Sequence, residues 1–457
     1  MASGREHAGA SASDGAPRGA GLRPAQLLAV GGMLFSMFFG AGNLILPPLL
    51  GLQAGSEAVS AMAGFLAAGI GLPVLGIVAV AVCGGVRELA GRVSPLFASV
   101  FIALMYLTIG PFLAIPRTSS TAFEMLKPLL PAADAAGATM MAVVFSVAFF
   151  GVAFALALRP GLLSRVLGRF SAPALILLIV LVVGASVLGG AGEPAAPHAP
   201  YAESAVSHGF LTGYQTMDLL AALCFGIVVA ANVRELGVSD PKRVAGSISS
   251  AGVIAGALMT AIYCGLGFVG ASMGAAMPDA TNGAAILTAS ASAHFGAAGT
   301  VIVAAIFLLA CLNVCTGLIS CCSEYFSEAV PRVPLAAWAA LFAVFSCAVS
   351  LLGLDAILAF SAPLLGALYP PAIVLVIMGL LHRQCDRLPR MWPWAVLVTA
   401  AFSVIVGLRD AFAPGMWLPL DALPFAAMGL GWVLPAVAGA VVGAVLSRAP
   451  APSPRSR

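Results

Sequence analysis

The stretch Phe38-Phe39-Gly40-Ala41-Gly42-Asn43-Leu44-Ile45-Leu46-Pro47-Pro48 interrupts the first long apolar segment of the chain, residues 25–50. It places two glycines and an asparagine near the middle of a segment that is long enough to cross a bilayer. A membrane helix keeps its backbone groups bonded, and an interruption is tolerated only where it lines a cavity. Glycine alone also serves close helix packing, but packing does not explain an asparagine at mid-span. The stretch therefore predicts a broken helix at a binding cavity.

A second interrupted segment, Gly209-Phe210-Leu211-Thr212-Gly213-Tyr214-Gln215-Thr216-Met217-Asp218, lies five predicted spans further along the chain. Because five is an odd number, the two segments cross the membrane in opposite directions. Paired interruptions in two halves are typical of inverted-repeat transporters, whose binding site lies near the bilayer midplane. We therefore predict an all-α polytopic membrane protein with two inverted five-helix repeats, at about 25–191 and 209–381, followed by two extra spans within 392–447.

The composition indicates a chain surrounded by lipid. Of its 457 residues, 61% are hydrophobic and 9% are charged, whereas soluble domains carry about 25% charged residues. So few charges could not cover a water-facing surface. A short segment, 283–295, is predicted to form a half-helix packed on the outer face. Twelve segments are predicted to span the bilayer, at 25–50, 57–82, 97–124, 138–158, 172–191, 209–233, 244–272, 297–323, 334–352, 356–381, 392–408 and 422–447.

Basic residues fall on one side of this topology. With the N-terminus inside, 18 of the 21 Lys and Arg residues lie in cytoplasmic segments, and only Lys127 and Arg409 lie in outer loops. This asymmetry follows the positive-inside rule. It predicts a multi-pass protein of the bacterial inner membrane with both termini in the cytoplasm, and it explains the net charge of +3 without a nucleic-acid partner. Residues 23–447 form the predicted transporter domain, and 1–22 and 448–457 are predicted to be disordered cytoplasmic tails.

Several ordered motifs resemble those of the branched-chain amino acid:cation symporters, the BrnQ-type carriers. They begin with the first-span stretch quoted above and continue to the tenth span. The further motifs are Gly51-Leu52-Gln53-Ala54-Gly55, Gly110-Pro111, Pro116-Arg117-Thr118, Gly209-Phe210, Gly213-Tyr214, Thr216-Met217-Asp218, Phe225-Gly226-Ile227-Val228, Asn282-Gly283-Ala284-Ala285-Ile286-Leu287 and Tyr369-Pro370-Pro371.

This resemblance implies a leucine-transporter-like fold and a secondary transporter rather than an enzyme. It implies uptake of leucine, isoleucine and valine together with sodium or, in some members, protons. The implied partners are the amino acid and the cation, with no cofactor and no obligate protein partner. A related carrier of another small solute on the same fold, driven by protons, is the alternative.

A zwitterionic substrate needs a cradle for its carboxylate, acceptors for its ammonium and a pocket for its side chain. Backbone N–H groups at the N-terminus of a half-helix that begins near Ala41 would bind the carboxylate. Carbonyl groups freed where the two helices unwind would accept from the ammonium. Apolar residues, among them Phe39, Tyr106, Phe112 and Phe225, would hold the side chain or else face lipid. The predicted substrate-binding residues are Phe39, Gly40, Ala41, Gly42, Asn43, Tyr214, Thr216, Asp218 and Phe225.

Asp218 and Arg117 are the two charged residues that the topology places deepest in the membrane. A charge at the bilayer centre costs roughly 2.5–3.5 kcal/mol on insertion scales, so each needs a partner or a function. Asp218 is predicted to bind substrate or cation, or to carry a proton. Alternatively, Asp218 and Arg117 pair with each other, or bond to freed helix ends, and only stabilise the core.

Asn313, Thr316 and Ser320 share one face of the eighth predicted span, at i, i+3 and i+7. Hard cations prefer oxygen ligands, and the resemblance implies a sodium site between this span and carbonyls of the first. The predicted ligands are Phe39, Gly42, Asn313, Thr316 and Ser320, although these side chains could equally form ordinary interhelical hydrogen bonds. Val314 stands where the family carries a hydroxyl, which leaves proton coupling through Asp218 as the alternative.

Overall fold

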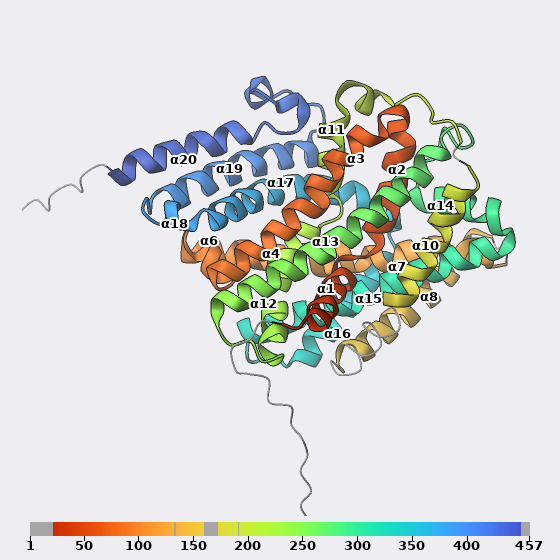
Figure 1. The fold of residues 1–457 in the computed structure, drawn as a ribbon, viewed down its shortest axis with the longest axis horizontal. Helices are drawn as coiled ribbons and strands as arrows, with labels where there is room; N and C mark the ends of the chain where they lie inside the picture. The colour runs from red at the N-terminus through yellow and green to blue at the C-terminus, as the bar shows by residue number, and fades with distance from the viewer. Residues whose placement is uncertain (1–21, 132–133, 160–171, 191, 449–457) are drawn as a thin grey trace, which may run out of the picture.

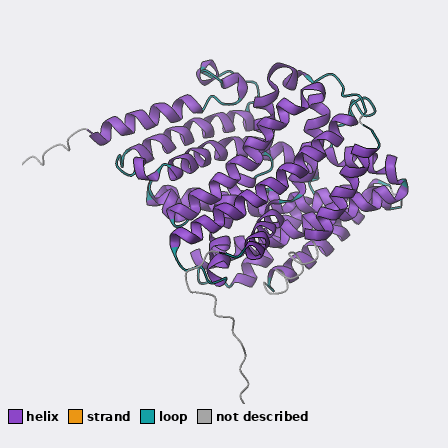
Figure 2. Ribbon diagram, in the orientation of Figure 1, coloured by secondary structure: helices purple, strands orange, loops and turns teal. Residues whose placement is uncertain are grey.

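The chain is almost entirely helical. A computed structural model describes residues 22–131, 134–159, 172–190 and 192–448, and no strand occurs among them (Figure 2). In this part of the chain, seven helices or consecutive helical runs are long and apolar enough to cross a bilayer. Four shorter apolar helices lie beside them. The predicted tails fall outside the described residues except at Leu22 and Arg448, and the total of twelve spans stays a prediction.

The first half of the chain supplies five helical segments, three of which contain an irregular stretch. Two of these stretches, η2 and η3, are single π-helical turns. In chain order the elements are α1 (Pro24–Phe38), α2 (Ala41–Ala54), η1 (Gly55–Glu57), α3 (Ala58–Leu66), η2 (Ala67–Gly71), α4 (Leu72–Cys83), α5 (Val86–Gly91), α6 (Pro95–Leu107), η3 (Thr108–Phe112), α7 (Ala114–Leu126), η4 (Lys127–Leu129), α8 (Ala135–Ala157) and α10 (Ala172–Leu188).

The second half repeats this plan and adds two helices. Its elements are α11 (Ala199–Tyr214), α12 (Asp218–Glu235), α13 (Pro241–Ser272), α14 (Gly283–Phe295), α15 (Ala297–Ala329), α16 (Leu335–Ser350) and α17 (Leu354–Leu380). They are followed by α18 (His382–Cys385), α19 (Met391–Phe412), η6 (Pro419–Ala422), η7 (Ala426–Met428) and α20 (Val433–Arg448). The predicted half-helix at 283–295 matches α14.

The two halves interlock through matched contacts. α1 and α2 pack on α13, while α11 and α12 pack on α3 and α4, so the same contact recurs five spans later in the chain. Likewise α7 packs on α15 and α8 on α16. α17, α19 and α20 lie side by side as a layer at one edge of the molecule (Figure 1). The broken helix of each half is therefore held by an unbroken run of the other half.

Two predicted spans differ from the structure. The third predicted span, 97–124, is not continuous, because Gly110 has a non-helical backbone (ψ −121°) and Pro111 has no N–H to donate. The twelfth, 422–447, begins only at Val433. Phe425 and Gly429 take the left-handed conformation, with φ of 66° and 69°. A right-handed helix cannot continue through such residues.

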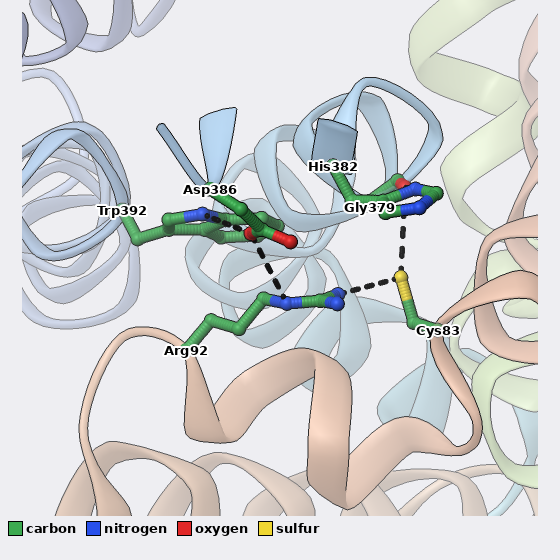
Figure 3. Close-up of polar contacts among 6 residues, drawn as sticks. All are labelled: Cys83, Arg92, Gly379, His382, Asp386 and Trp392. Atoms are coloured by element: carbon green, nitrogen blue, oxygen red, sulfur yellow. Dashed lines mark hydrogen bonds and ion pairs between the residues drawn. The ribbon is translucent and has the colours of Figure 1, made fainter. Parts of the chain in front are cut away.

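One polar cluster joins α4 to the last part of the fold (Figure 3). Arg92 Nη1 donates to Cys83 Sγ at 2.7 Å, and Arg92 Nε lies 3.4 Å from an Asp386 carboxylate oxygen. The same oxygen accepts from the indole N–H of Trp392 at 3.2 Å, and the guanidinium stacks 5.3 Å from the centre of the Trp392 ring. We call Cys83, Arg92, Asp386 and Trp392 the Arg92 cluster.

Candidate functional site

The first break separates α1 from α2 at the predicted position. Phe39 and Gly40 have extended backbones, with ψ of 96° and −161°, and α2 restarts at Ala41. The first N–H groups of a helix have no partner within it, and here no side chain caps them. The N-terminus of α2, with its positive end of the helix dipole, is therefore available to an anion.

The second break separates α11 from α12. Met217 takes a left-handed backbone conformation (φ 65°), which is uncommon for a residue with a side chain. The Thr216 hydroxyl accepts from the Asp218 N–H at 3.3 Å and donates to the Gly213 carbonyl at 2.9 Å. This threonine thus bonds the broken backbone on both sides of the turn, and it leaves Asp218 in the first turn of α12.

The third break, in the third predicted span, was missed by sequence reasoning. The π-helical turn η3 ends before α7 starts at Ala114, and Arg117 lies in the first turn of α7. The sequence signal was present in Gly110-Pro111, which combines a flexible residue with one that cannot donate a backbone hydrogen bond.

A cavity lies where these three breaks meet. The empty space at this cavity, counted together with its opening to solvent, is about 390 Å³. The apolar part of its lining includes Phe38 and Ala41, the residues on either side of the first break. The polar lining residues are Arg117, Asp218, Asn43, Thr118 and Thr216. The other lining residues are Met37, Phe38, Gly40, Ala41, Gly42, Ile109, Ala114, Met217, Ala221, Phe225, Val314 and Leu318.

Asp218 is anchored by two neutral side chains. Its Oδ2 accepts from Asn43 Nδ2 at 2.8 Å and from the Tyr263 hydroxyl at 3.4 Å, and Asn43 Nδ2 also lies 2.5 Å from that hydroxyl. Asp218, Asn43 and Tyr263 are all buried. The cluster therefore joins α2, α12 and α13, and it explains why an asparagine stands at mid-span. Sequence reasoning missed Tyr263, because a single tyrosine in an apolar helix carries no pattern.

Arg117 bonds to a freed helix end. Its Nη1 donates to the Gln215 carbonyl at 2.8 Å, just beyond the last turn of α11. Its guanidinium also abuts Gly42, since a Cβ added to Gly42 would lie 2.6 Å from Nη2. No carboxylate of the described residues lies within 4.0 Å of Arg117. Of the two structural alternatives, the structure shows the bond to a helix end and not the direct pair with Asp218.

Seven of the nine predicted substrate-binding residues line the cavity, and Phe39 and Tyr214 do not. The Phe39 ring stacks on Phe35, with 5.0 Å between ring centres, because the chain is still helical through Phe38 and residues four apart share a face. Phe38 lines the cavity instead. The Tyr214 ring stacks on Tyr369 at 4.3 Å. Tyr106 is also outside the lining, and Phe112 is exposed.

The predicted cation ligands on α15 do not line the cavity either. The Thr316 hydroxyl donates to the Leu312 carbonyl of its own helix at 2.6 Å, and the Ser320 hydroxyl donates to Glu324 at 3.4 Å. Asn313 is buried, and its amide nitrogen has no hydrogen-bond partner. The face of α15 toward the break carries Val314 and Leu318, and a Cβ on Gly40 would lie 2.9 Å from Val314 Cγ2.

The family model described as branched-chain amino acid transport protein matches residues 23–450 of this chain. The chain belongs to this family. The prediction from the motifs is confirmed, and the protein is a multi-pass membrane transporter.

Members of the family from several bacteria align over nearly the whole chain. The Bacillus subtilis branched-chain amino acid permease BraB is 37% identical over 422 residues, 92% of this chain and 94% of its own. The carrier protein of branched-chain amino acid transport system 2 of Pseudomonas aeruginosa is 38% identical, over 93% and 97% of the two chains. The Corynebacterium glutamicum permease BrnQ is 39% identical, over 90% and 92%.

Solved structures confirm the predicted fold class. The nucleobase-cation-symport-1 family transporter Mhp1, in a closed conformation, superposes with a TM-score of 0.58 at 15% identity and covers 95% of each chain. MhsT in complex with L-phenylalanine superposes with a TM-score of 0.52 at 15% identity, over 95% of this chain and 100% of its own. At this identity the likeness shows the fold alone. This family member therefore has the leucine-transporter-like arrangement of two inverted repeats and two extra helices.

Proposed function

We propose that the protein imports leucine, isoleucine and valine across the bacterial inner membrane by symport with a cation, with sodium as the first candidate ion. The observation that carries this proposal is the cavity at the meeting of the helix breaks. There the uncapped N-terminus of α2 faces a wall of branched aliphatic and aromatic side chains. The names of the bacterial relatives, which specify branched-chain amino acids, support the substrate class.

The cavity suits each part of such a substrate. The backbone N–H groups of Ala41, Gly42 and Asn43 would receive the carboxylate, beside the Arg117 guanidinium that abuts Gly42. Ile109, Val314, Leu318 and the neighbouring aromatic rings would contact a branched aliphatic chain. Such a pocket combines a mostly apolar lining with a few convergent polar groups, as is usual for small-molecule sites.

Sodium coupling would use backbone carbonyl oxygens of the first break, just after α1 ends at Phe38. Asn313 or Thr316 of α15 would add a side-chain oxygen. Proton coupling is the second candidate. It is favoured by Val314, whose side chain faces Gly40 and cannot ligate a cation, and by the buried carboxylate of Asp218 within the cavity. The two candidates differ in what drives accumulation, which a transport assay can separate.

We expect leucine accumulation in proteoliposomes to require an inward sodium gradient. At fixed pH, replacing sodium with choline should reduce uptake to the passive background, and Asn313→Ala or Thr316→Ala should raise the sodium concentration needed for half-maximal uptake. Thr399→Ala is the matched control, because its hydroxyl also donates to its own helix, to the Ala395 carbonyl at 2.7 Å, but lies on α19. Full uptake without sodium, together with dependence on a proton gradient, would select the second candidate.

We expect an impermeant thiol reagent added outside cells to label a cysteine at position 193 but not one at position 242. Glu193 precedes α11 and Lys242 begins α13, and both residues are exposed. They lie on opposite sides of the membrane in the predicted topology. Permeabilised cells, in which both positions should react, provide the control. Labelling of position 242 alone from outside would reverse the proposed orientation.

A further inference from the structure

We infer that Arg117 and Asp218 bind the two charges of the substrate, the guanidinium holding the carboxylate and the aspartate holding the ammonium. The inference rests on the proposed function and names two specificity-determining residues for it. It goes beyond a backbone cradle, because it makes the zwitterionic form of the ligand, and not only its carboxylate, the feature that the site recognises.

The guanidinium of Arg117 is buried and incompletely bonded. The residue is 3% exposed, Nη1 donates to the Gln215 carbonyl, and Nε has no hydrogen-bond partner. A buried cation without a carboxylate partner is unfavourable. Because Arg117 also lines the cavity, an anionic group that enters the cavity would supply the missing partner.

The guanidinium lies beside the N-terminus of α2, so two anion-binding features face the same space. The close approach of Nη2 to Gly42 puts the arginine fork next to the first uncapped N–H groups of the helix. A carboxylate can accept two parallel bonds from a guanidinium and further bonds from backbone N–H groups, since it has two oxygens with about four lone-pair sites. The two features therefore favour a carboxylate.

Asp218 offers the opposite charge within the same cavity. Its hydrogen bonds from Asn43 and Tyr263 come from neutral groups, and both fall on Oδ2. These bonds fix the orientation of the carboxylate, and no cation of the described residues lies within 4.0 Å of it. An ammonium group, with three N–H donors, would provide that cation.

Arg117 and Asp218 bond to different partners. Arg117 is tied to the end of α11 by Gln215, while Asp218 is tied to α2 and α13 by Asn43 and Tyr263. Two opposite buried charges that line one cavity without pairing are complementary to a zwitterion. Neutral solutes and simple anions would satisfy at most one of them.

The test measures binding of labelled leucine to the purified full-length protein, with leucinamide and 4-methylpentanoate as competitors. Leucinamide lacks the carboxylate, and 4-methylpentanoate lacks the ammonium. In the wild type we expect both to bind at least about tenfold more weakly than leucine, because each loses a charge-assisted hydrogen-bonding group. Arg117→Gln should weaken leucine binding about 10- to 100-fold and leave leucinamide binding unchanged. Asp218→Asn should do the same for leucine and leave 4-methylpentanoate unchanged.

Arg409→Gln and Asp421→Asn are the matched controls. These residues form an ion pair with an N···O distance of 2.5 Å outside the cavity, and neither substitution should alter the preference among the three ligands. Compared with Arg117→Gln, Arg117→Lys should recover part of the preference for leucine over leucinamide. Lysine restores the positive charge but not the two parallel hydrogen bonds of a guanidinium.

Equal weakening of leucine and leucinamide in Arg117→Gln would assign the arginine a purely structural role and overturn the inference. If the neutral variants do not fold, the wild type decides, because leucinamide or 4-methylpentanoate binding as tightly as leucine would also overturn it. Absence of saturable leucine binding to the wild type would contradict the proposed function itself.

Discussion

Gly42→Leu is expected to abolish leucine uptake while the protein still inserts and folds. A Cβ at this position would lie 2.6 Å from Arg117 Nη2, closer than real Cβ atoms approach, and 3.1 Å from its Cζ, so the guanidinium would have to shift. Such a shift would break the Nη1 bond to the Gln215 carbonyl and displace the guanidinium from the cavity wall. The leucine side chain would also occupy the space above the first N–H groups of α2. Uptake should therefore fall to background in proteoliposomes.

Gly32→Leu is the matched control for this variant. Gly32 lies in α1, the other half of the same broken helix, and a Cβ there meets no atom within 4 Å. It should retain near-normal uptake. Both variants should elute as monodisperse protein in detergent, so that a loss of transport is not a loss of fold. Near-normal uptake by Gly42→Leu would remove this segment from the binding site.

Gly209→Leu is expected to prevent folding rather than transport alone. A Cβ on Gly209 would lie 1.9 Å from the Ala61 carbonyl oxygen, and a Cβ on Gly64 would lie 1.9 Å from the Val206 carbonyl oxygen. α3 and α11 thus pack backbone to backbone, as small residues permit in membranes. The overlap is with main-chain atoms, which no side-chain rotation relieves. We expect destabilisation of more than about 4 kcal/mol, at the severe end of single substitutions.

The measurement is the yield of monodisperse protein after detergent extraction. Gly184→Leu on α10 is the control, because a Cβ at Gly184 meets nothing within 4 Å. A well-folded Gly209→Leu protein would show that α3 and α11 can separate without loss of the fold. The contrast with Gly42→Leu, which should lose only transport, separates the residues that build the scaffold from those that meet substrate.

The sequence predicted the two broken helices because their causes are local. Glycines and polar residues in an apolar run change the backbone where they stand, and so the breaks at Phe39 and at Gln215 to Met217 lie where they were expected. The break at Gly110 was not predicted. A glycine and a proline within an otherwise apolar span are compatible with a continuous, kinked helix, and only packing against neighbouring helices decides between the two.

Other parts of the site depend on tertiary arrangement. Tyr263 meets Asn43 across 220 positions of the chain, a pairing for which a single sequence holds no signal. Helical spacing correctly groups Asn313, Thr316 and Ser320 on one face of α15, but it does not say which face turns toward α1. That orientation follows from how α15 packs on its neighbours, and it presents Val314 and Leu318 to the cavity.

The contacts of the Arg92 cluster are weak enough to break and re-form readily. The side chains of its ion pair are 25% and 43% exposed, and an ion pair of this exposure is worth only about 0.2–1 kcal/mol. The stacking of Arg92 on Trp392 adds about 0.5–1 kcal/mol, so these two contacts together contribute about 1–2 kcal/mol. Such an energy leaves about 3 to 15 per cent of molecules with these two contacts released at any instant. Thermal energy is therefore enough to separate Arg92 from Asp386 and Trp392, and these two contacts join the α4 end to the last part of the fold without locking it.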